Sequence, residues 1–296
     1  MNAAFLPLVA SLVPVALAVA VVATLRKRQE RNGLRSPIAN KRIHGAGEEL
    51  RKRIDEQTRE IMRFVLTLLL VGPYFFAVWA LNHVQWNQVV FGTIEIPYLI
   101  AAAAMTIWAI RRLVIHGAAR RRAIAGLRAE LFTAQELNRL LAKGCAVAHD
   151  LPGDHFNIDH VVIGPHVVYA VETKSIRKPP GRKREDTFKV AYDGKSLRFP
   201  HFVTRAPIIQ AQKQAQWLAR YLRDTINQPV RVIPAVALPG WWIYSPTHNR
   251  DCAVPVFNPA GLGAEFMADP QKARPFDAAT VAQIKQALVM RYPMEG

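Results

Sequence analysis

The side chains of this chain best suited to chemistry are two carboxylates and one ammonium. Asp159 precedes Glu172 by 13 residues, and Lys174 follows two positions after Glu172. The residues between them are mostly β-branched or aromatic and are interrupted by Gly164-Pro165, a pattern typical of a β-hairpin. Because charged side chains are costly in buried strands unless they are paired or bind a cation, these three residues indicate a functional site.

The spacing predicts that the three side chains share one face of a sheet. Glu172 and Lys174 are two apart on an extended segment, so both leave the same face. If an even number of residues joins the two strands, Asp159 lies opposite or diagonal to Glu172 on that face. A three-residue loop would break this match unless a bulge restored it.

The chemistry that fits such a group is metal-assisted hydrolysis. Mg²⁺ prefers oxygen ligands and is usually held by one or two carboxylates together with substrate phosphates, and Mn²⁺ is the natural substitute. A neighbouring Lys174 could orient the attacking water or stabilise the charge that develops on the phosphate. The alternative is a surface ion pair between Glu172 and Lys174 at a strand end, which would contribute little to stability.

The sequence around these residues resembles the nuclease-related domain (NERD) branch of the PD-(D/E)XK nuclease superfamily. The resemblance covers roughly residues 124–238, and its most specific words are residues 157–165 (NIDHVVIGP) and 168–174 (VYAVETK). Ile158 stands where the superfamily has its proline, and His166-Val167 replaces the usual glycine after the turn. The resemblance implies a restriction-endonuclease-like α/β fold, dependence on a divalent metal and a nucleic-acid substrate.

The resemblance also implies roles for individual residues. Asp159 and Glu172 would bind the metal, and Lys174 would position and polarise the attacking water. Glu130, on the first helix, would complete the metal shell or hold Lys174. Gln210 ends a Pro-x-x-Gln segment and would support Lys174 or a phosphate.

A basic cluster begins three residues after Lys174, on a segment that contains proline and glycine. Because this cluster lies beside the expected metal site, we expect it to contact the phosphate backbone of a nucleic acid. A solvated, flexible loop is the alternative. The five basic residues are Arg177, Lys178, Arg182, Lys183 and Arg184.

Three apolar segments predict membrane spans, at Phe5–Leu25, Phe64–Leu81 and Val89–Ile110. The first could instead be a cleaved signal peptide, although no side-chain charge precedes it. The expected organisation is a transmembrane helix over 1–25, a basic cytoplasmic loop over 26–62, two transmembrane helices within 63–115 and, after a basic hinge, a nuclease-like domain over 120–296.

The distribution of lysine and arginine predicts the orientation in the membrane. Basic clusters follow the first and third segments, whereas residues 82–88 contain no Lys or Arg. The positive-inside rule therefore places the protein in the inner (cytoplasmic) membrane, with the N-terminus outside and the C-terminal domain in the cytoplasm. Much of the formal net charge of +17 lies beside these segments, where anionic lipid head groups are the expected partner.

The C-terminal part predicts a mixed sheet flanked by helices. Helices are expected over 124–143, 208–222 and 278–290, and strands over 145–150, 188–192, 197–199 and 230–238 in addition to the hairpin. Cys145 and Cys252 are too far apart for a zinc pair, and both read as packing residues. Phosphate-binding glycine loops, dinucleotide fingerprints and serine nucleophile elbows are absent from the sequence.

These observations favour a membrane-anchored, metal-dependent nuclease that acts on DNA or RNA. The first alternative is a membrane-tethered nucleic-acid-binding or scaffold protein of the same fold that does not cut. The second is a small subunit of a membrane complex whose soluble domain binds a protein partner. Cleavage of nucleic acid would favour the nuclease, and salt-sensitive binding without cleavage would favour the first alternative. Neither cleavage nor binding would favour the second.

Overall fold

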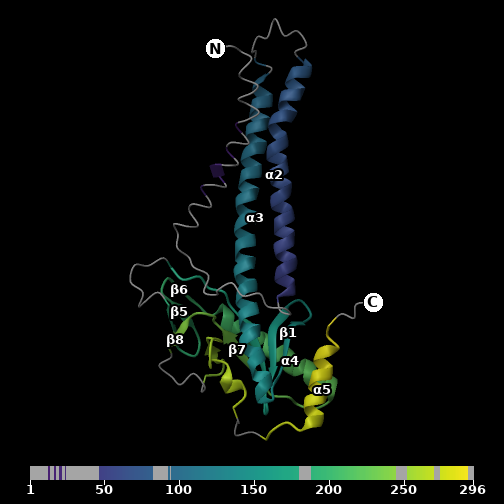
Figure 1. The fold of residues 1–296 in the computed structure, drawn as a ribbon, viewed down its shortest axis with the longest axis vertical. Helices are drawn as coiled ribbons and strands as arrows, with labels where there is room; N and C mark the ends of the chain where they lie inside the picture. Colours follow the sequence, from purple (N-terminus) through teal and green to yellow (C-terminus); the bar gives the residue numbers. More distant parts are fainter. Residues whose placement is uncertain are drawn as a thin grey trace. The chain divides into compact units, whose positions relative to one another are not determined.

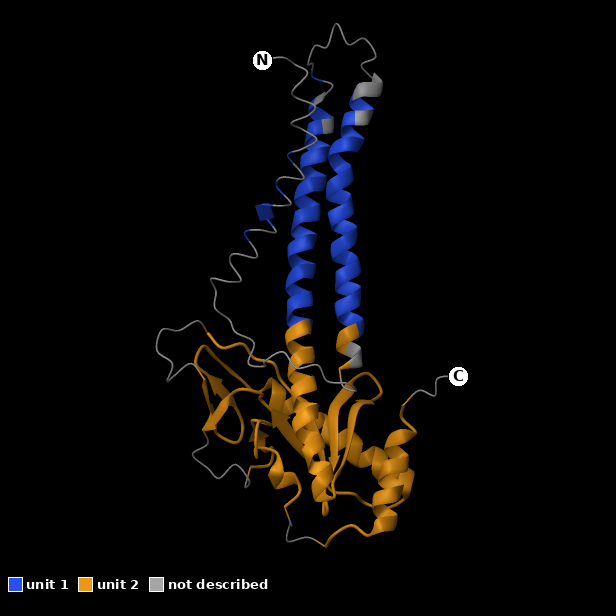
Figure 2. Cartoon of the chain, in the orientation of Figure 1, with its two compact units in different colours: residues 1–33, 52–123 blue, residues 34–51, 124–296 orange. Residues whose placement is uncertain are grey.

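The structure is a computed structural model that describes residues 13, 17, 20, 21, 24, 47–82, 93, 95–179, 188–244, 252–269 and 274–292 (Figure 1). The chain divides into two compact units (Figure 2). Unit 1 comprises residues 1–33 and 52–123, and unit 2 comprises residues 34–51 and 124–296.

Unit 1 is built on two long helices, α2 (Glu48–Asn82) and α3 (Glu95–Asn138), each of which also contributes residues to unit 2. Within unit 1 the ring of Phe64 meets that of Trp108 edge to face at 5.2 Å. His116 Nδ1 lies 2.8 Å from Gln57 Oε1 and Arg120 Nε donates to Thr58 Oγ1 at 2.8 Å. Apolar packing and polar contacts therefore both join the two helices.

One helix among the described residues is long and apolar enough to cross a membrane, Leu99–Lys143, with 45 residues. It overlaps the third predicted span. The second predicted span, Phe64–Leu81, is helical within α2 but does not meet the same criterion. The first, Phe5–Leu25, falls mostly outside the described residues. The prediction of three membrane helices is therefore not confirmed.

The helices also extend beyond their predicted bounds. α2 begins at Glu48, inside the segment 26–62 that was expected to be a loop. α3 continues through residues 120–122, where a basic hinge was expected. Alanine, arginine and leucine dominate residues 118–131, and these are strong helix formers, so the chain has no local reason to break there.

The main sheet of unit 2 has five strands in the order β1-β2-β3-β7-β9. The first two pairings are antiparallel, and β3 with β7 and β7 with β9 are parallel. The mixed sheet flanked by helices agrees with the predicted fold class. The strands are β1 (Ala146–Pro152), β2 (Asn157–Ile163), β3 (Val168–Thr173), β7 (Val232–Ala237) and β9 (Val256–Phe257).

Helices cover both faces of this sheet. One core cluster joins Val161, Val168 and Ala170 of the sheet to Leu218 of α4 (Ala206–Ile226) and to α5 (Ala278–Val289). A second cluster lies on the opposite face, against the C-terminal turns of α3, the 3-10 helix η2 (Arg139–Lys143) and η4 (Glu265–Met267). Both faces are therefore buried, as an α/β layer arrangement requires.

A second, four-stranded sheet has the order β6-β5-β4-β8. Its strands are β4 (Lys189–Tyr192), β5 (Leu197–Phe199), β6 (Phe202–Thr204) and β8 (Trp242–Tyr244). The predicted hairpin over 188–199 corresponds to β4 and β5, whereas β6, β8 and β9 were not predicted. Val190, Tyr192 and Leu197 of this sheet pack with Ile208 of α4 and with Trp241 in a third core cluster.

Candidate active site

The hairpin of β2 and β3 brings Asp159 and Glu172 face to face. Residues 164–167 join the strands, so the loop is even, and the register pairs Ile163 with Val168 and His160 with Val171. Asp159 and Glu172 are the next pair in this register, one step beyond the last paired residues. Gln214 of α4 donates to Glu172, so Glu172 lies on the face of the sheet that α4 covers. The negative charge of Glu172 raises the pKa of Asp159, so the two carboxylates lie within electrostatic reach of each other.

The carboxylate of Asp159 caps the end of the ladder. Its Oδ2 accepts a hydrogen bond from the backbone N–H of Thr173 at 2.6 Å. The side chain thus provides an acceptor for an N–H that lies beyond the last paired residues of β2 and β3. Burial raises the pKa of Asp159 well above its usual value, and the negative charges of Glu172 and Glu130 raise it further. The Thr173 N–H and the Lys174 ammonium act in the opposite direction without cancelling this effect.

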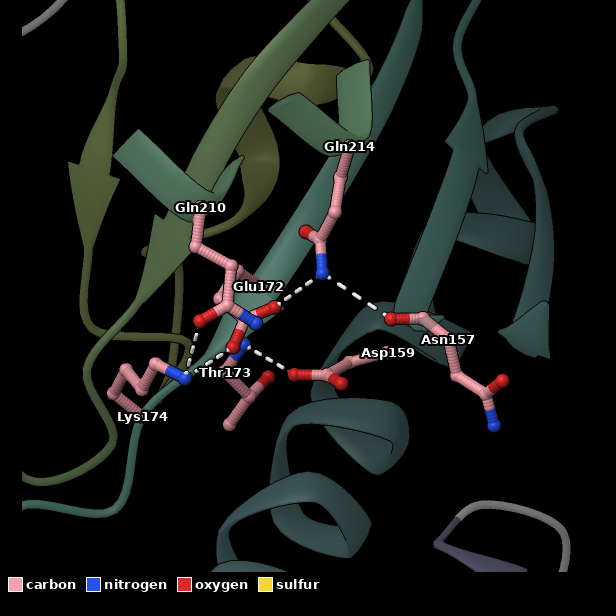
Figure 3. Close-up of polar contacts among 7 residues, drawn as sticks. All are labelled: Asn157, Asp159, Glu172, Thr173, Lys174, Gln210 and Gln214. Carbon is pink, nitrogen blue, oxygen red and sulfur yellow. Dashed lines mark hydrogen bonds and ion pairs between the residues drawn. The ribbon is translucent and has the colours of Figure 1, made fainter. Parts of the chain in front are cut away.

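Glu172 is buried, with an exposed fraction of 2%, and both of its carboxylate oxygens are engaged (Figure 3). Lys174 Nζ lies 2.5 Å from Oε1, and Gln214 Nε2 donates to Oε2 at 2.6 Å. Lys174 is itself about one-third exposed, so its ammonium links the buried carboxylate to the surface. The contact is therefore not the surface ion pair considered from the sequence, because one partner is fully buried.

Two glutamines of α4 hold the ends of this network. Gln210 Oε1 accepts from Lys174 Nζ at 3.0 Å, as the family resemblance suggested for that residue. Gln214 is one helical turn further on and is 2% exposed. Its Nε2 also donates to the backbone oxygen of Asn157 at 3.2 Å, so it joins β2 to Glu172 of β3.

Gln214 was not among the site residues predicted from the sequence. The signal that could have found it is its spacing. Residues i and i+4 of a helix lie on the same face, so a glutamine four positions after Gln210 faces the same site. Its Oε1 is buried and has no hydrogen-bond partner among the residues that the structure describes.

Glu130 approaches the site from α3. Its negative charge raises the pKa of Asp159, which places the two carboxylates within electrostatic reach of each other. The backbone of Gly47 lies close by, since a Cβ added to this glycine would come 3.5 Å from Glu130 Oε2 and 2.2 Å from Leu127 Cδ1. Gly47 also has a positive φ of 79°, a conformation that glycine adopts without strain.

Asp159 and Glu172 are the residues of this site that could hold a divalent cation. Among the described residues, no group of three or more His, Cys, Asp or Glu side chains is arranged to hold a metal ion. Burial raises the pKa of Asp159, and the nearby negative charge of Glu172 raises it further, so the two carboxylates lie close enough to share one cation. A cation bound by two carboxylates and otherwise by water and substrate is the usual arrangement for Mg²⁺.

The two histidines that flank Asp159 in sequence form a contact with each other on the opposite face. His149 Nδ1 lies 2.9 Å from His160 Nδ1, and His149 Nε2 lies 3.1 Å from Asn138 Oδ1. Burial lowers the pKa of both imidazoles. The lowered pKa values favour the neutral form of both imidazoles, which lie in contact with each other. Cys145 and Cys252 are free thiols, and Cys145 is buried.

The predicted basic cluster lies partly within the described residues. Lys178 Nζ is 5.7 Å from the centre of the Trp241 ring and 5.9 Å from that of Phe188. Trp241 Nε1 also donates to the backbone oxygen of Ile176 at 3.0 Å, which fixes the segment after Lys174. Arg177 lies in the same described segment, while Arg182, Lys183 and Arg184 fall outside the described residues.

Comparison with known proteins agrees with this geometry. The family model described as "Nuclease-related domain" (NERD) matches residues 125–239, a range that contains Glu130, Asp159, Glu172, Lys174 and Gln210. The chain matches none of the curated proteins and none of the solved structures with which it was compared. Residues 125–239 therefore belong to the nuclease-related domain family, in keeping with a fold of the PD-(D/E)XK nuclease superfamily.

Proposed function

We propose that this protein is a membrane-anchored, metal-dependent nuclease that hydrolyses phosphodiester bonds of DNA or RNA. The observation that carries the proposal is the opposition of Asp159 and Glu172 on neighbouring strands, with the ammonium of Lys174 against Glu172. Two carboxylates and one lysine that meet at the end of a hairpin form a site for charge stabilisation rather than an ordinary core.

Asp159 and Glu172 would hold Mg²⁺ or Mn²⁺. When bound, the cation would polarise the phosphodiester and stabilise the negative charge that develops on it. Glu130 would add negative charge beside the cation, because its field already reaches Asp159. Burial of Glu172 and its bond from Gln214 would keep the carboxylate oriented toward the site.

Lys174 would act on the attacking water. Its Nζ can donate three hydrogen bonds, and Glu172 Oε1 and Gln210 Oε1 take two of them. These two hydrogen bonds fix the direction of the third N–H of the Lys174 ammonium. A water that accepts from this N–H would therefore be held in one orientation. The ammonium would also stabilise negative charge on the phosphate as the bond breaks.

Membrane anchoring is the second part of the proposal. Leu99–Lys143 is the candidate span, and both helices of unit 1 expose large apolar side chains. Leu70 of α2 is 64% exposed and Ile107 of α3 is 66% exposed, and apolar side chains in such number suit contact with lipid. The basic residues near these segments would face anionic head groups on the cytoplasmic side of the inner membrane, with the N-terminus outside.

The nucleic-acid partner would be held in part by the basic segment after Lys174, including Arg177, Lys178, Arg182, Lys183 and Arg184. The first alternative remains a membrane-tethered protein of the same fold that binds nucleic acid or acts as a scaffold without cutting. The buried contact between Glu172 and Lys174 favours the nuclease, because a purely structural role would be served as well by an apolar pair.

The proposal is tested by incubating the full-length protein in detergent with labelled DNA and RNA, with EDTA, Mg²⁺ or Mn²⁺. We expect cleavage only with a divalent cation, and loss of cleavage in Glu172→Ala and Lys174→Ala. Lys213→Ala, which changes an exposed lysine of α4, should cut normally. Salt-sensitive binding without any cleavage would support the non-catalytic alternative, and neither binding nor cleavage would support a role toward a protein partner.

A further inference from the structure

The second sheet has one buried face and one exposed face. Val190, Tyr192, Leu197 and Phe199 point into a core cluster. The alternate residues point outward, and the register aligns Val203, Arg198, Ala191 and Tyr244 across all four strands, with Lys189 beside Trp242. We call the surface formed by Lys189, Arg198, Val203, Trp242 and Tyr244 the outer face of the second sheet; its strands β5, β6 and β8 are labelled in Figure 1.

Two aromatic side chains of the outer face are exposed to solvent and do not pack in the core. Trp242 is 64% exposed and Tyr244 is 61% exposed, while the neighbouring Trp241 is fully buried. The two exposed rings are two residues apart on β8, so they leave the same face at a spacing of roughly 6.6 Å. Large aromatic side chains left in water are a mark of a binding surface rather than of folding.

The charge of the outer face is positive. Lys189 and Arg198 are both exposed, and the residues of β4, β5, β6 and β8 include no Asp or Glu. Lys189 pairs in register with Trp242, and Arg198 lies in the same row as Tyr244. Each ring therefore has a cation on the same face, separated from it by at most one strand.

The outer face is connected to the candidate active site by a short, fixed segment. Lys174 N donates to the backbone oxygen of Ala237 at 3.0 Å, and Ile176 O accepts from the ring nitrogen of Trp241 at 3.0 Å. Trp242 N in turn donates to Phe188 O at 2.9 Å, next to Lys189. Both the segment after Lys174 and the start of β4 are thus held against residues 241–242.

We propose that the outer face of the second sheet binds single-stranded nucleic acid, with Trp242 and Tyr244 stacking on bases and Lys189 and Arg198 contacting phosphates. Aromatic rings on a positively charged surface are the general means of binding a single strand without sequence preference. The ring spacing is about twice the ~3.4 Å rise per nucleotide of a stacked strand, so the two bases would be unstacked from each other. That the bound strand is delivered to Lys174 rests on the proposed nuclease function.

The test measures binding of fluorescein-labelled oligo-dT and oligo-U to the full-length protein in detergent, by anisotropy in EDTA, where no cleavage occurs. We expect Trp242→Ala and Tyr244→Ala each to weaken binding roughly 5- to 150-fold, the range for loss of one stacked base. Trp242→Phe should bind nearly normally. Leu262→Ala, which removes a side chain that is 75% exposed outside the sheet, serves as the matched control.

Lys189 and Arg198 provide a second test, the salt dependence of binding, which does not require that the aromatic variants fold. Lys189→Gln and Arg198→Gln should each lower the slope of log affinity against log salt by about one. Unchanged affinity in both aromatic variants together with an unchanged salt slope would overturn the proposal. Quenching of Trp242 fluorescence by brominated lipid in nanodiscs would also overturn it, because the outer face would then contact the membrane. The quenched signal is assigned to Trp242 if it is missing from Trp242→Phe. Lack of metal-dependent cleavage would refute only the nuclease function.

Discussion

Gln214 Nε2 donates a hydrogen bond of 2.6 Å to Glu172 Oε2, and both side chains are 2% exposed. The same nitrogen reaches the backbone oxygen of Asn157 at 3.2 Å. One amide therefore ties α4 to the two strands that carry the carboxylates. A buried carboxylate with such a partner is fixed in position, whereas without it the charge would be left partly unpaired.

Replacing Gln214 should destabilise the fold as well as the site. In Gln214→Ala the Oε2 of Glu172 and the oxygen of Asn157 both lose a buried donor, so we expect the free energy of unfolding to fall by about 1–3 kcal/mol. Gln216→Ala changes an exposed glutamine of the same helix and should have little effect. Thermal denaturation of the full-length variants checks this, and equal melting temperatures for the two variants would contradict the assigned contact.

Lys174→Met should separate cation binding from chemistry. Removal of the ammonium leaves Glu172 Oε1 without its 2.5 Å partner and makes the site more negative. We therefore expect Mn²⁺ affinity to be retained or increased while cleavage falls by at least ~100-fold, the scale of losing one group that stabilises developing charge. Lys213→Met is the control. A variant that still cuts at the wild-type rate would remove Lys174 from the mechanism.

Trp241 should anchor the segment that follows Lys174. Trp241→Phe keeps an aromatic ring in the core but loses the donor to Ile176 O, which costs about 1 kcal/mol. We expect faster hydrogen exchange over residues 175–179 and faster tryptic cutting after Arg177, with the main sheet unaffected. Trp242→Phe, one residue on, should behave as wild type. Equal exchange in the two variants would show that the bond does not hold the segment.

The turn between β4 and β5 should contribute stability that depends on pH. Asp193 accepts hydrogen bonds from the hydroxyl and N–H of Ser196 and from Lys195 N, and these lower its pKa to about 2. Because the folded pKa is depressed, the contribution is fully present above the ordinary value of 3.8 and is lost as pH falls toward about 2. Asp193→Asn should therefore lower the melting temperature at neutral pH, and the difference should shrink below pH ~4. A difference that grows on acidification would contradict the assignment.

The hairpin and its carboxylates could be predicted from the sequence because the relevant rules are local. The even loop at 164–167 sets the register of β2 against β3, and this register brings Asp159 close to Glu172. The spacing from Gln210 indicates the helix face on which Gln214 lies, but its burial depends on how α4 is rotated against the sheet, which no local pattern encodes. The approach of Glu130 likewise depends on the packing of α3, which no local pattern encodes.

The unpredicted elements share a different cause. β6, β8 and β9 have three, three and two residues, too few for periodicity to show, and they exist because longer strands lie beside them. The buried Trp241 and the exposed Trp242 have identical side chains, and only the tertiary fold distinguishes them. The continuous helix α3 was divided in the prediction because its charged middle looked like a boundary, although its residues favour helix throughout.

The proposed chemistry requires that Asp159 and Glu172 bind one cation between them. Electron paramagnetic resonance of Mn²⁺ titrated into the full-length protein tests it most directly, without reliance on a substrate. We predict one site per chain that is lost in both Asp159→Asn and Glu172→Gln and retained in Asp154→Asn, a change of an exposed carboxylate outside the site. Mn²⁺ binding that is the same in all three variants would contradict the account.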